Sequence, residues 1–187
     1  GNAAAVLLAL NDLWGLALSR EQLLAYALKL GSDVPFCLLG GTVAARGRGE
    51  QMQPLEPLKG CAFVLVHPAI AVNTAQAFAH PRLDRQPPPR EGQSEPFARA
   101  IAHLERGRVP EALFNRMEPP LFEEYPELGG IKERLLSAGC EGAVMSGSGP
   151  TMVGLCRSRV VAASMAARIK DCATSFAVPT MSGVAYV

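Results

Sequence analysis

The order of the apolar segments after residue 60 constrains the fold of this chain more than any other feature. Residues 62–67 form a short and almost continuous apolar run, which is typical of a central strand. Further patterns predict helices at 97–106, 110–114 and 126–138, strands at 142–145 and 151–156, a helix from Ser158, and a last strand at 176–178 with residues 182–187 beside it. Strand, helices, strand, strand, helix, strand is the order of a ferredoxin-like, or split βαβ, domain. We therefore predict an α+β fold.

The start of the chain has a different pattern. Residues 3–14 place apolar side chains at helical spacing. Ser19 and Gln22 have the spacing of a capping box for a second helix, and residues 42–45 are suited to a strand. A protein seldom begins inside a helix of core quality without a leader, so we expect a preceding segment.

These two patterns predict two domains. We interpret residues 1–60 as part of one unit and residues 61–187 as the ferredoxin-like domain. Residues 81–96 are rich in proline and in charged side chains, and we predict that they form an exposed loop.

Composition excludes several classes of protein. Lys and Arg number 18 and Asp and Glu 17, and the resulting net charge of +1 argues against nucleic acid as the main partner. No uncharged apolar stretch of about 18 residues is present, so we expect no membrane-spanning helix. The five cysteines lack the close pairs of a zinc site, and Cys61, Cys140 and Cys156 lie in apolar runs. We predict buried, reduced thiols, no metal site and a cytoplasmic location.

Asp33 is the first candidate for chemistry. It follows a helix end, lies between glycine-rich turns and precedes Pro35 by two positions. A carboxylate in such a turn can accept the proton of a substrate hydroxyl as that hydroxyl attacks phosphorus. The alternative is that Asp33 caps a short helix beginning at Pro35, because Asp is a favoured cap and Pro a favoured first residue.

The second candidate is the run of Ser146, Gly147, Ser148 and Gly149. Glycines allow backbone N–H groups to turn toward an anion, so this segment could cradle a phosphate. The alternative is a hairpin turn between two strands, which needs glycine for positive φ in any case. The segment is not a P-loop, because no Lys-Ser or Lys-Thr follows it.

Two further groups allow both a binding and a structural interpretation. Phe78 lies one helical turn after Thr74 and could stack on a nucleobase or belong to the core. Arg48, between Gly47 and Gly49, could hold a phosphate or be an exposed charge in a tight turn.

Taken together, these segments resemble the GHMP kinases. The resemblance rests on residues 2–14, 30–36, 40–42, 47–50, 64–68, 74–78, 115–118 and 145–151. They have the order and spacing of the family and extend over nearly the whole chain, least clearly at 81–96. Within the family, the similarity is to the branch that acts on a CDP-linked methylerythritol in non-mevalonate isoprenoid biosynthesis.

The resemblance implies an ATP-dependent phosphorylation of a hydroxyl on the erythritol part of CDP-methylerythritol, with Mg²⁺ bridging the ATP phosphates. By position, Asp33 would be the catalytic carboxylate. Asn2 and residues 146–149 would bind the phosphates. Thr74 would line the substrate cleft and Phe78 would stack on the cytosine. No residue of the chain is implied as a metal ligand.

The chain departs from the family pattern at its start. The main phosphate loop of the family is a glycine- and serine-rich run, of which only Asn2, Ala3 and Ala4 remain, with Gly1 where a serine is expected. Earlier strands and the lysine that partners the aspartate are missing too, so residues 1–60 would be the remnant of an S5-like N-terminal domain. We therefore expect a piece of a longer kinase that by itself binds ATP poorly and turns over little.

Two other functions remain open from the sequence. One is another GHMP small-molecule kinase, whose substrate would lack cytidine. The other is a non-catalytic ferredoxin-like binding module, in which no acidic residue need lie beside the glycine-rich turns. An apolar helix near the N-terminus would also allow a homo-oligomer.

Overall fold

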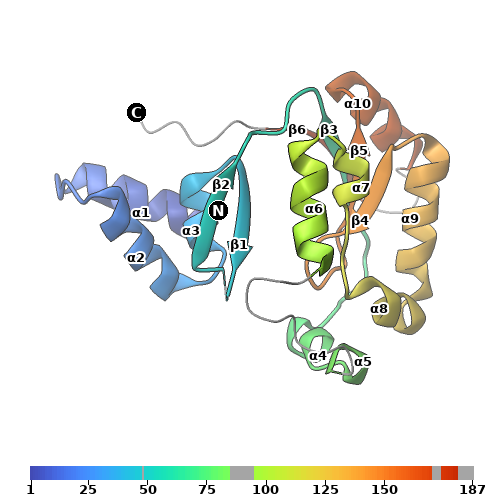
Figure 1. Ribbon diagram of the computed structural model, residues 1–187, viewed down its shortest axis with the longest axis horizontal. Helices are drawn as coiled ribbons and strands as arrows, with labels where there is room; N and C mark the ends of the chain where they lie inside the picture. The colour runs from blue at the N-terminus through green and yellow to red at the C-terminus, as the bar shows by residue number, and fades with distance from the viewer. Residues whose placement is uncertain (48, 85–94, 170–173, 181–187) are drawn as a thin grey trace. The chain divides into compact units, whose positions relative to one another are not determined.

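A computed structural model describes residues 1–47, 49–84, 95–169 and 174–180 of the chain (Figure 1). The chain forms two compact units, Gly1–Leu58 and Lys59–Thr180, which we call unit 1 and unit 2 and describe separately. Arg48 and residues 182–187, for which the sequence suggested roles, lie outside the described residues. Within the described part, no helix has the length and apolar character needed to cross a membrane.

Unit 1 contains helices and a hairpin. Its elements are α1 (Asn2–Leu13), α2 (Arg20–Leu30), α3 (Val34–Leu39), β1 (Thr42–Arg46) and β2 (Gln51–Leu55). The predicted capping box is present, because Ser19 Oγ accepts from the N–H of Gln22 while Gln22 Oε1 accepts from the N–H of Ser19. The helices pack around a small core that includes Leu23 and Leu38.

Strand β2 is not predicted by the sequence, because Pro54 indicated a connection. In the structure β1 and β2 pair antiparallel, with Thr42 opposite Leu55 and Val43 opposite Pro54. Among the described residues this sheet has two strands, and β2 pairs on one side only. Proline is tolerated on such an edge because the hydrogen bond that it cannot donate is not needed there.

Unit 2 is built on a four-stranded sheet. Its elements are β3 (Ala62–His67), α4 (Thr74–Phe78), α5 (Pro81–Asp84), α6 (Glu95–Glu105), α7 (Val109–Ala112), α8 (Glu118–Glu124), α9 (Pro126–Ala138), β4 (Gly142–Met145), β5 (Met152–Cys156), α10 (Arg159–Arg168) and β6 (Thr174–Pro179). The strand order is β4-β5-β3-β6, and all neighbours are antiparallel. This is the predicted ferredoxin-like order, with α9 and α10 packed on the sheet (Figure 1).

The core of unit 2 lies between the sheet and these two helices. Ala62, Val64 and Val66 alternate along β3 and are buried, as expected for a strand with one face in the core. Leu128 and Leu135 are fully buried along α9. Strands β4 and β5 are therefore fixed on a packed base, and the turn between them projects from it.

Two segments of unit 2 differ from the predictions. Residues 81–84, at the start of the predicted exposed loop, form α5, and Leu83 is only 3% exposed. Burial of the Leu83 side chain stabilises this helix despite the surrounding prolines and charges. Residues 85–94 of the predicted loop lie outside the described residues. Helix α8 was not predicted. Its first turn contains Pro119 and Pro120, and the first turn is a position in a helix that proline tolerates.

Candidate functional site

The turn after β4 requires glycine at two positions. Gly147 has φ +55° and Gly149 has φ +76°, a region that side chains other than glycine rarely adopt. A Cβ on Gly149 would also lie 2.8 Å from Met145 Sδ. The hairpin interpretation of this segment is therefore confirmed, and the same conformation determines where its N–H groups point.

Two adjacent N–H groups of this turn are available to a ligand. The N–H of Gly149 donates to Ser146 O at 2.9 Å, and the N–H of Ser146 donates to Thr151 O at 2.8 Å. Among the described residues, the N–H groups of Gly147 and Ser148 have no acceptor. Successive unpaired N–H groups in a turn of this kind form a concavity that favours an anion.

Helix α4 lies against this turn. Asn73 caps α4 by accepting from the N–H of Gln76 at 3.2 Å, which fixes the start of the helix. The next residue, Thr74, accepts a hydrogen bond from Ser148 Oγ at 3.1 Å. Phe78, at the other end of α4, is 62% exposed, so the interpretation of its ring as part of the core is wrong.

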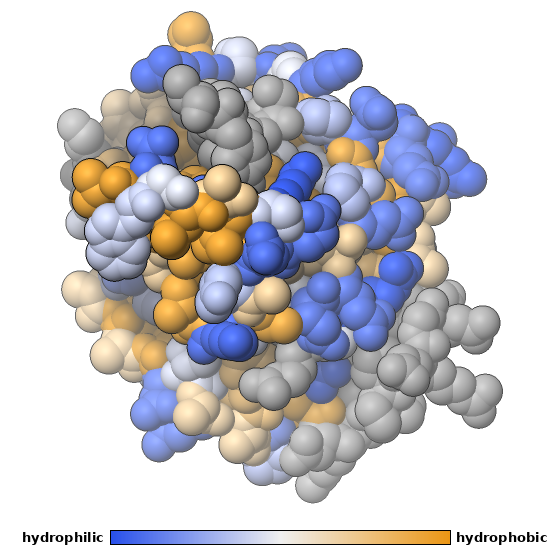
Figure 2. All heavy atoms as spheres, turned by 90° about the vertical axis from the view of Figure 1, so that its left-hand side faces the viewer, coloured by the Kyte–Doolittle hydropathy of each residue, from blue (hydrophilic) through white to orange (hydrophobic). Residues whose placement is uncertain are grey.

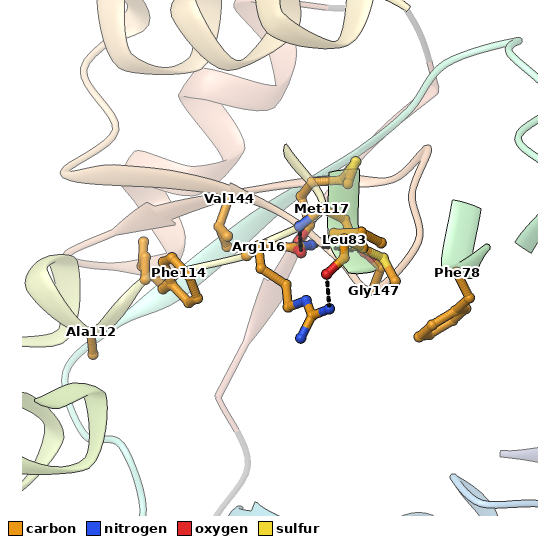
Figure 3. A pocket seen from close by; sticks show the side chains of 11 residues that line it. Phe78, Leu83, Ala112, Phe114, Arg116, Met117, Val144 and Gly147 are labelled. Atoms are coloured by element: carbon orange, nitrogen blue, oxygen red, sulfur yellow. Dashed lines mark hydrogen bonds between the residues drawn. The ribbon is translucent and has the colours of Figure 1, made fainter. Parts of the chain in front are cut away.

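A pocket of about 630 Å³ opens beside the turn. Its lining consists of Phe78, Leu83, Ala112, Leu113, Phe114, Asn115, Arg116, Met117, Val144, Met145 and Gly147. Figure 3 shows the guanidinium of Arg116 between Phe114 and Phe78, donating to the carbonyl of Leu83 at 3.2 Å. Aromatic rings, a cation and the glycine turn thus border one cavity, an arrangement suited to a ligand with a flat ring and negative charge.

Asn115, just before α8, and Glu118, the first residue of α8, hold the base of the turn. Asn115 Nδ2 donates to Met145 O and to Gly147 O, both at 2.7 Å. Glu118 is 9% exposed; its Oε1 accepts from the N–H of Met145 at 2.7 Å, and its Oε2 accepts from Lys132 Nζ at 2.5 Å. Residues 115–118 carry part of the family resemblance, but the sequence predicts no role for them.

Asp33 is free of the structural role that the sequence suggested as an alternative. It precedes α3 and occupies the cap position with φ −88° and ψ −12°, and its side chain makes no capping hydrogen bond among the described residues. The short helix with Pro35 near its start is therefore present, but the Asp33 carboxylate does not stabilise it. The side chain is exposed, so its oxygens can reach a ligand.

Asn2 begins α1. The cap residue Gly1 offers no side chain to the first turn, and that turn contains no acidic residue. A helix of this length has a partial positive charge at its N-terminus, which favours an anion there. The side chain of Asn2 is exposed at this end.

The structure brings part of the predicted site together. Ser148 and Thr74 are hydrogen bonded to each other, and Phe78 and Gly147 line the same pocket, all within unit 2. Asn2 and Asp33 belong to unit 1. Phe114 and Arg116 were not predicted as pocket residues, although an aromatic and a basic residue two positions apart at the end of a predicted helix are a signal that could have found them.

Sequence patterns of known families match both units. The pattern described as GHMP kinases N terminal domain matches residues 1–41, and that described as GHMP kinases C terminal matches residues 97–173, together more than half of the chain. The chain belongs to the GHMP kinases.

Individual members of the family are also similar to this GHMP kinase chain. A protein of Pelotomaculum thermopropionicum is 40% identical over 171 residues, covering 90% of this chain and 58% of the relative, and one of Gloeobacter violaceus is 42% identical over 170 residues, covering 89% and 56%. Both are named 4-diphosphocytidyl-2-C-methyl-D-erythritol kinase. The chain therefore spans a little more than half the length of these curated relatives.

A solved structure supports the same relationship. The crystal structure of a 4-(cytidine 5'-diphospho)-2C-methyl-D-erythritol kinase matches with a TM-score of 0.78 and 34% identity, covering 97% of this chain and 64% of that one. The mixed α/β fold of both units is thus that of the GHMP kinases.

Proposed function

We propose that the whole protein transfers a phosphoryl group from ATP to a hydroxyl of 4-diphosphocytidyl-2-C-methyl-D-erythritol, a step of non-mevalonate isoprenoid biosynthesis. The observation that carries the proposal is the identity of about 40% over about 90% of the chain to proteins with this named activity. Membership of a kinase family disfavours the non-catalytic binding module.

Asp33 is the proposed catalytic carboxylate. Its exposed side chain is not engaged in capping α3, which leaves its oxygens free to accept a hydrogen bond from the attacking hydroxyl. A carboxylate in that position orients the hydroxyl and takes its proton as the bond to phosphorus forms. Orientation of this kind and stabilisation of charge supply most of the acceleration in phosphoryl transfer.

The phosphates of ATP are proposed to bind the turn 146–149 and the N-terminus of α1 at Asn2. The free N–H groups of Gly147 and Ser148 support the first assignment, and the uncapped first turn of α1 supports the second. Donors that are fixed before the ligand arrives need no reorganisation as negative charge moves between oxygens.

Phe78 and Thr74 are proposed to bind the cytidine end of the substrate. The ring of Phe78 is exposed at the edge of a pocket, so that a pyrimidine could stack on it. Such stacking contributes about 1–3 kcal/mol per base. The Thr74 hydroxyl, already bonded to Ser148, would line the same cleft.

Mg²⁺ is proposed as the counter-ion of ATP. The described residues contain no cluster of three or more His, Cys, Asp or Glu side chains suited to a metal. The ion would be held mainly by phosphate oxygens and water, as is common for Mg²⁺. When bound, it would neutralise the charge of the transferred group.

The proposed location is the cytoplasm, supported by the free thiols of the four described cysteines.

A homo-oligomer is also proposed. Leu13, Trp14 and Leu16 at the end of α1 are 75%, 64% and 48% exposed, and Figure 2 shows hydrophobic side chains at the surface on this side of the molecule. Burial of such side chains against a second copy would stabilise an assembly.

Replacement of Asp33 tests the kinase proposal. In the whole protein, Asp33→Asn should lower kcat at least roughly 100-fold, because the amide cannot take the proton of the hydroxyl. Binding of ATP, measured by calorimetry, should be unchanged. Asp12→Asn is the matched control. Asp12 is also exposed in unit 1, but it lies near the C-terminal end of α1, at the opposite end of that helix from Asn2. A rate within a few-fold of wild type for Asp33→Asn would contradict the assignment.

The same kinetic assay tests which substrate the kinase phosphorylates. Phe78→Ala should raise the KM for 4-diphosphocytidyl-2-C-methyl-D-erythritol by roughly ten-fold, the equivalent of one lost stacking contact. A protein that prefers a hydroxyl substrate without cytidine, and that is indifferent to Phe78→Ala, would be a different GHMP kinase.

A further inference from the structure

Side chains replace a missing strand at the end of β4. Met145 is the last residue of β4, which lies at one edge of the sheet. Its N–H donates to Glu118 Oε1 and its C=O accepts from Asn115 Nδ2, each at 2.7 Å. The N–H and C=O of one strand residue point to the same side. Asn115 and Glu118 therefore bind Met145 as a further strand would.

Asn115 also reaches into the turn. Its Nδ2 donates a second hydrogen bond to Gly147 O at 2.7 Å, and its Oδ1 accepts from the N–H of Met117 at 2.9 Å. Both hydrogens of the amide group and its oxygen are thus engaged. An amide is the side-chain group that can donate to two carbonyls and accept an N–H in this way, so Asp at this position could not replace it.

The bond from Asn115 to Gly147 determines the direction of the next N–H. In a trans peptide, the C=O of one residue and the N–H of the following residue point in opposite directions. The peptide between Gly147 and Ser148 is trans. With its carbonyl held on Asn115, this peptide presents the N–H of Ser148 on the opposite side, where no acceptor lies among the described residues.

Without that bond, the peptide would have freedom to rotate. Gly147 has no Cβ and has open space around the place where one would be, so sterics alone do not fix its carbonyl. Glu118 restrains only the strand end before the turn. Its carboxylate is buried and paired with Lys132, so that loss of either partner would leave a charge unpaired next to Met145.

We propose that Asn115 is a positioning residue for phosphate binding: it fixes the Gly147–Ser148 peptide so that the N–H of Ser148 faces the anion, while Glu118 and Lys132 hold the strand end beneath it. This inference rests on the proposed function, because it requires that the turn binds a phosphate of ATP.

The test compares Asn115→Asp with wild type in the whole protein labelled with ¹⁵N. Asn115→Asp keeps the shape of the side chain but replaces the amide nitrogen, which donates to both carbonyls, with a carboxylate oxygen that can donate to neither. Mg-ATP is titrated while the amide resonance of Ser148 is followed by NMR and the dissociation constant is measured by calorimetry. Thermal unfolding is measured in parallel. Asn11→Asp is the matched control, because Asn11 uses only its oxygen, which accepts from the N–H of Leu18.

We expect Mg-ATP to shift the Ser148 resonance in wild type and in Asn11→Asp. In Asn115→Asp the shift should be lost and the dissociation constant should rise at least roughly ten-fold, as for one misplaced hydrogen bond to a charged group. A purely structural role would lower the unfolding temperature and leave the dissociation constant, measured well below that temperature, unchanged. If Asn115→Asp does not fold, Asn115→Ala provides the same comparison, because it removes both amide donors without adding charge.

The outcomes separate the two proposals. If wild type binds Mg-ATP and the Asn115 variant binds it equally well with the same Ser148 shift, the positioning role is overturned and the kinase proposal stands. If wild type binds no Mg-ATP, the kinase proposal is overturned and the positioning role with it.

Discussion

Two buried thiols lie next to each other in the core of unit 2. Cys140 and Cys156 are 7% and 0% exposed, and their sulfur atoms are 3.7 Å apart. Burial raises the pKa of the Cys140 thiol to about 12, and the neighbouring Cys156 adds to the shift. Burial raises the pKa of Cys156 as well. Both side chains are therefore neutral thiols at neutral pH, which makes them poor nucleophiles.

These thiols predict a loss of stability at alkaline pH. The ordinary pKa of the thiol is 9.0, so between about pH 9 and pH 12 an unfolded chain releases the proton that folded Cys140 retains. The free energy of unfolding therefore falls as pH rises in this window, by at most about 1.4 kcal/mol per pH unit. Cys140→Ala removes this contribution.

Urea unfolding of unit 2 at pH 8 and pH 10.5 measures the effect. Wild type should lose about 1–2 kcal/mol more between the two pH values than Cys140→Ala does. The change in the free energy of unfolding between the two pH values is compared for each protein. The titration of other groups and the smaller volume of alanine then cancel. Equal losses in the two proteins would contradict the assignment.

At the scale of single residues, the sequence predicted some burials and positions correctly and others not. Burial of Cys140 and Cys156 is confirmed, but Cys61 is only half-buried, because it precedes β3 at the end of the sheet. The position of Asp33 before a short helix is confirmed, while its freedom from capping is visible only in the structure. The pattern of residue types indicates where a side chain lies, but the bonds that it makes depend on partners distant in the chain, as Asn115 and Gly147 show.

Elements with local signals were predicted well. Helix α2 begins at its capping box, and α10 begins after Ser158, whose Oγ accepts from the N–H of Val161. Helix α9 ends at Gly139 in the left-handed conformation. Elements that depend on tertiary contacts were missed. Helix α5 is anchored by the buried Leu83, and no local pattern indicates that burial.

The two glycines of the hairpin turn between β4 and β5 should differ in how much stability is lost when each is replaced by alanine. Both have positive φ, which costs about 1 kcal/mol for alanine. A Cβ on Gly147 meets nothing within 4 Å, whereas one on Gly149 would lie 2.8 Å from the sulfur of the buried Met145. Gly149→Ala should therefore destabilise unit 2 by about 2–3 kcal/mol and Gly147→Ala by about 1 kcal/mol.

Native-state hydrogen exchange of the amides in β4 and β5 measures both costs. The two variants carry the same substitution in the same turn, so each is the control for the other. Equal free energies of unfolding for both variants would mean that Met145 moves aside without cost.

At the scale of the whole molecule, the two units have separate cores of different size. The buried cluster among the helices of unit 1 contains Ala4, Leu23, Ala27 and Leu38, whereas that of unit 2 extends over the sheet, α9 and α10. Unit 1 also exposes Leu13 and other large apolar side chains. Because stability depends on the apolar area removed from water, unit 1 has less to oppose its conformational entropy. The ferredoxin-like order of unit 2 was predictable from strand and helix patterns.

This difference predicts that, in the 187-residue chain by itself, unit 1 opens at a lower free energy than unit 2. Hydrogen exchange should show weaker protection in α1, α2 and α3 than in β3 and β5. Leu38→Ala should lower the opening free energy of unit 1 by about 2–4 kcal/mol, because Leu38 is 1% exposed and its loss leaves a cavity in a core with few other members. Leu128→Ala, the same change at a residue with no exposure in unit 2, should lower protection in β3 and β5 instead. If Leu38→Ala weakened protection in β3 and β5 as much as in the helices of unit 1, the two cores would not be energetically separate, and the division of the chain into two stability units would be wrong.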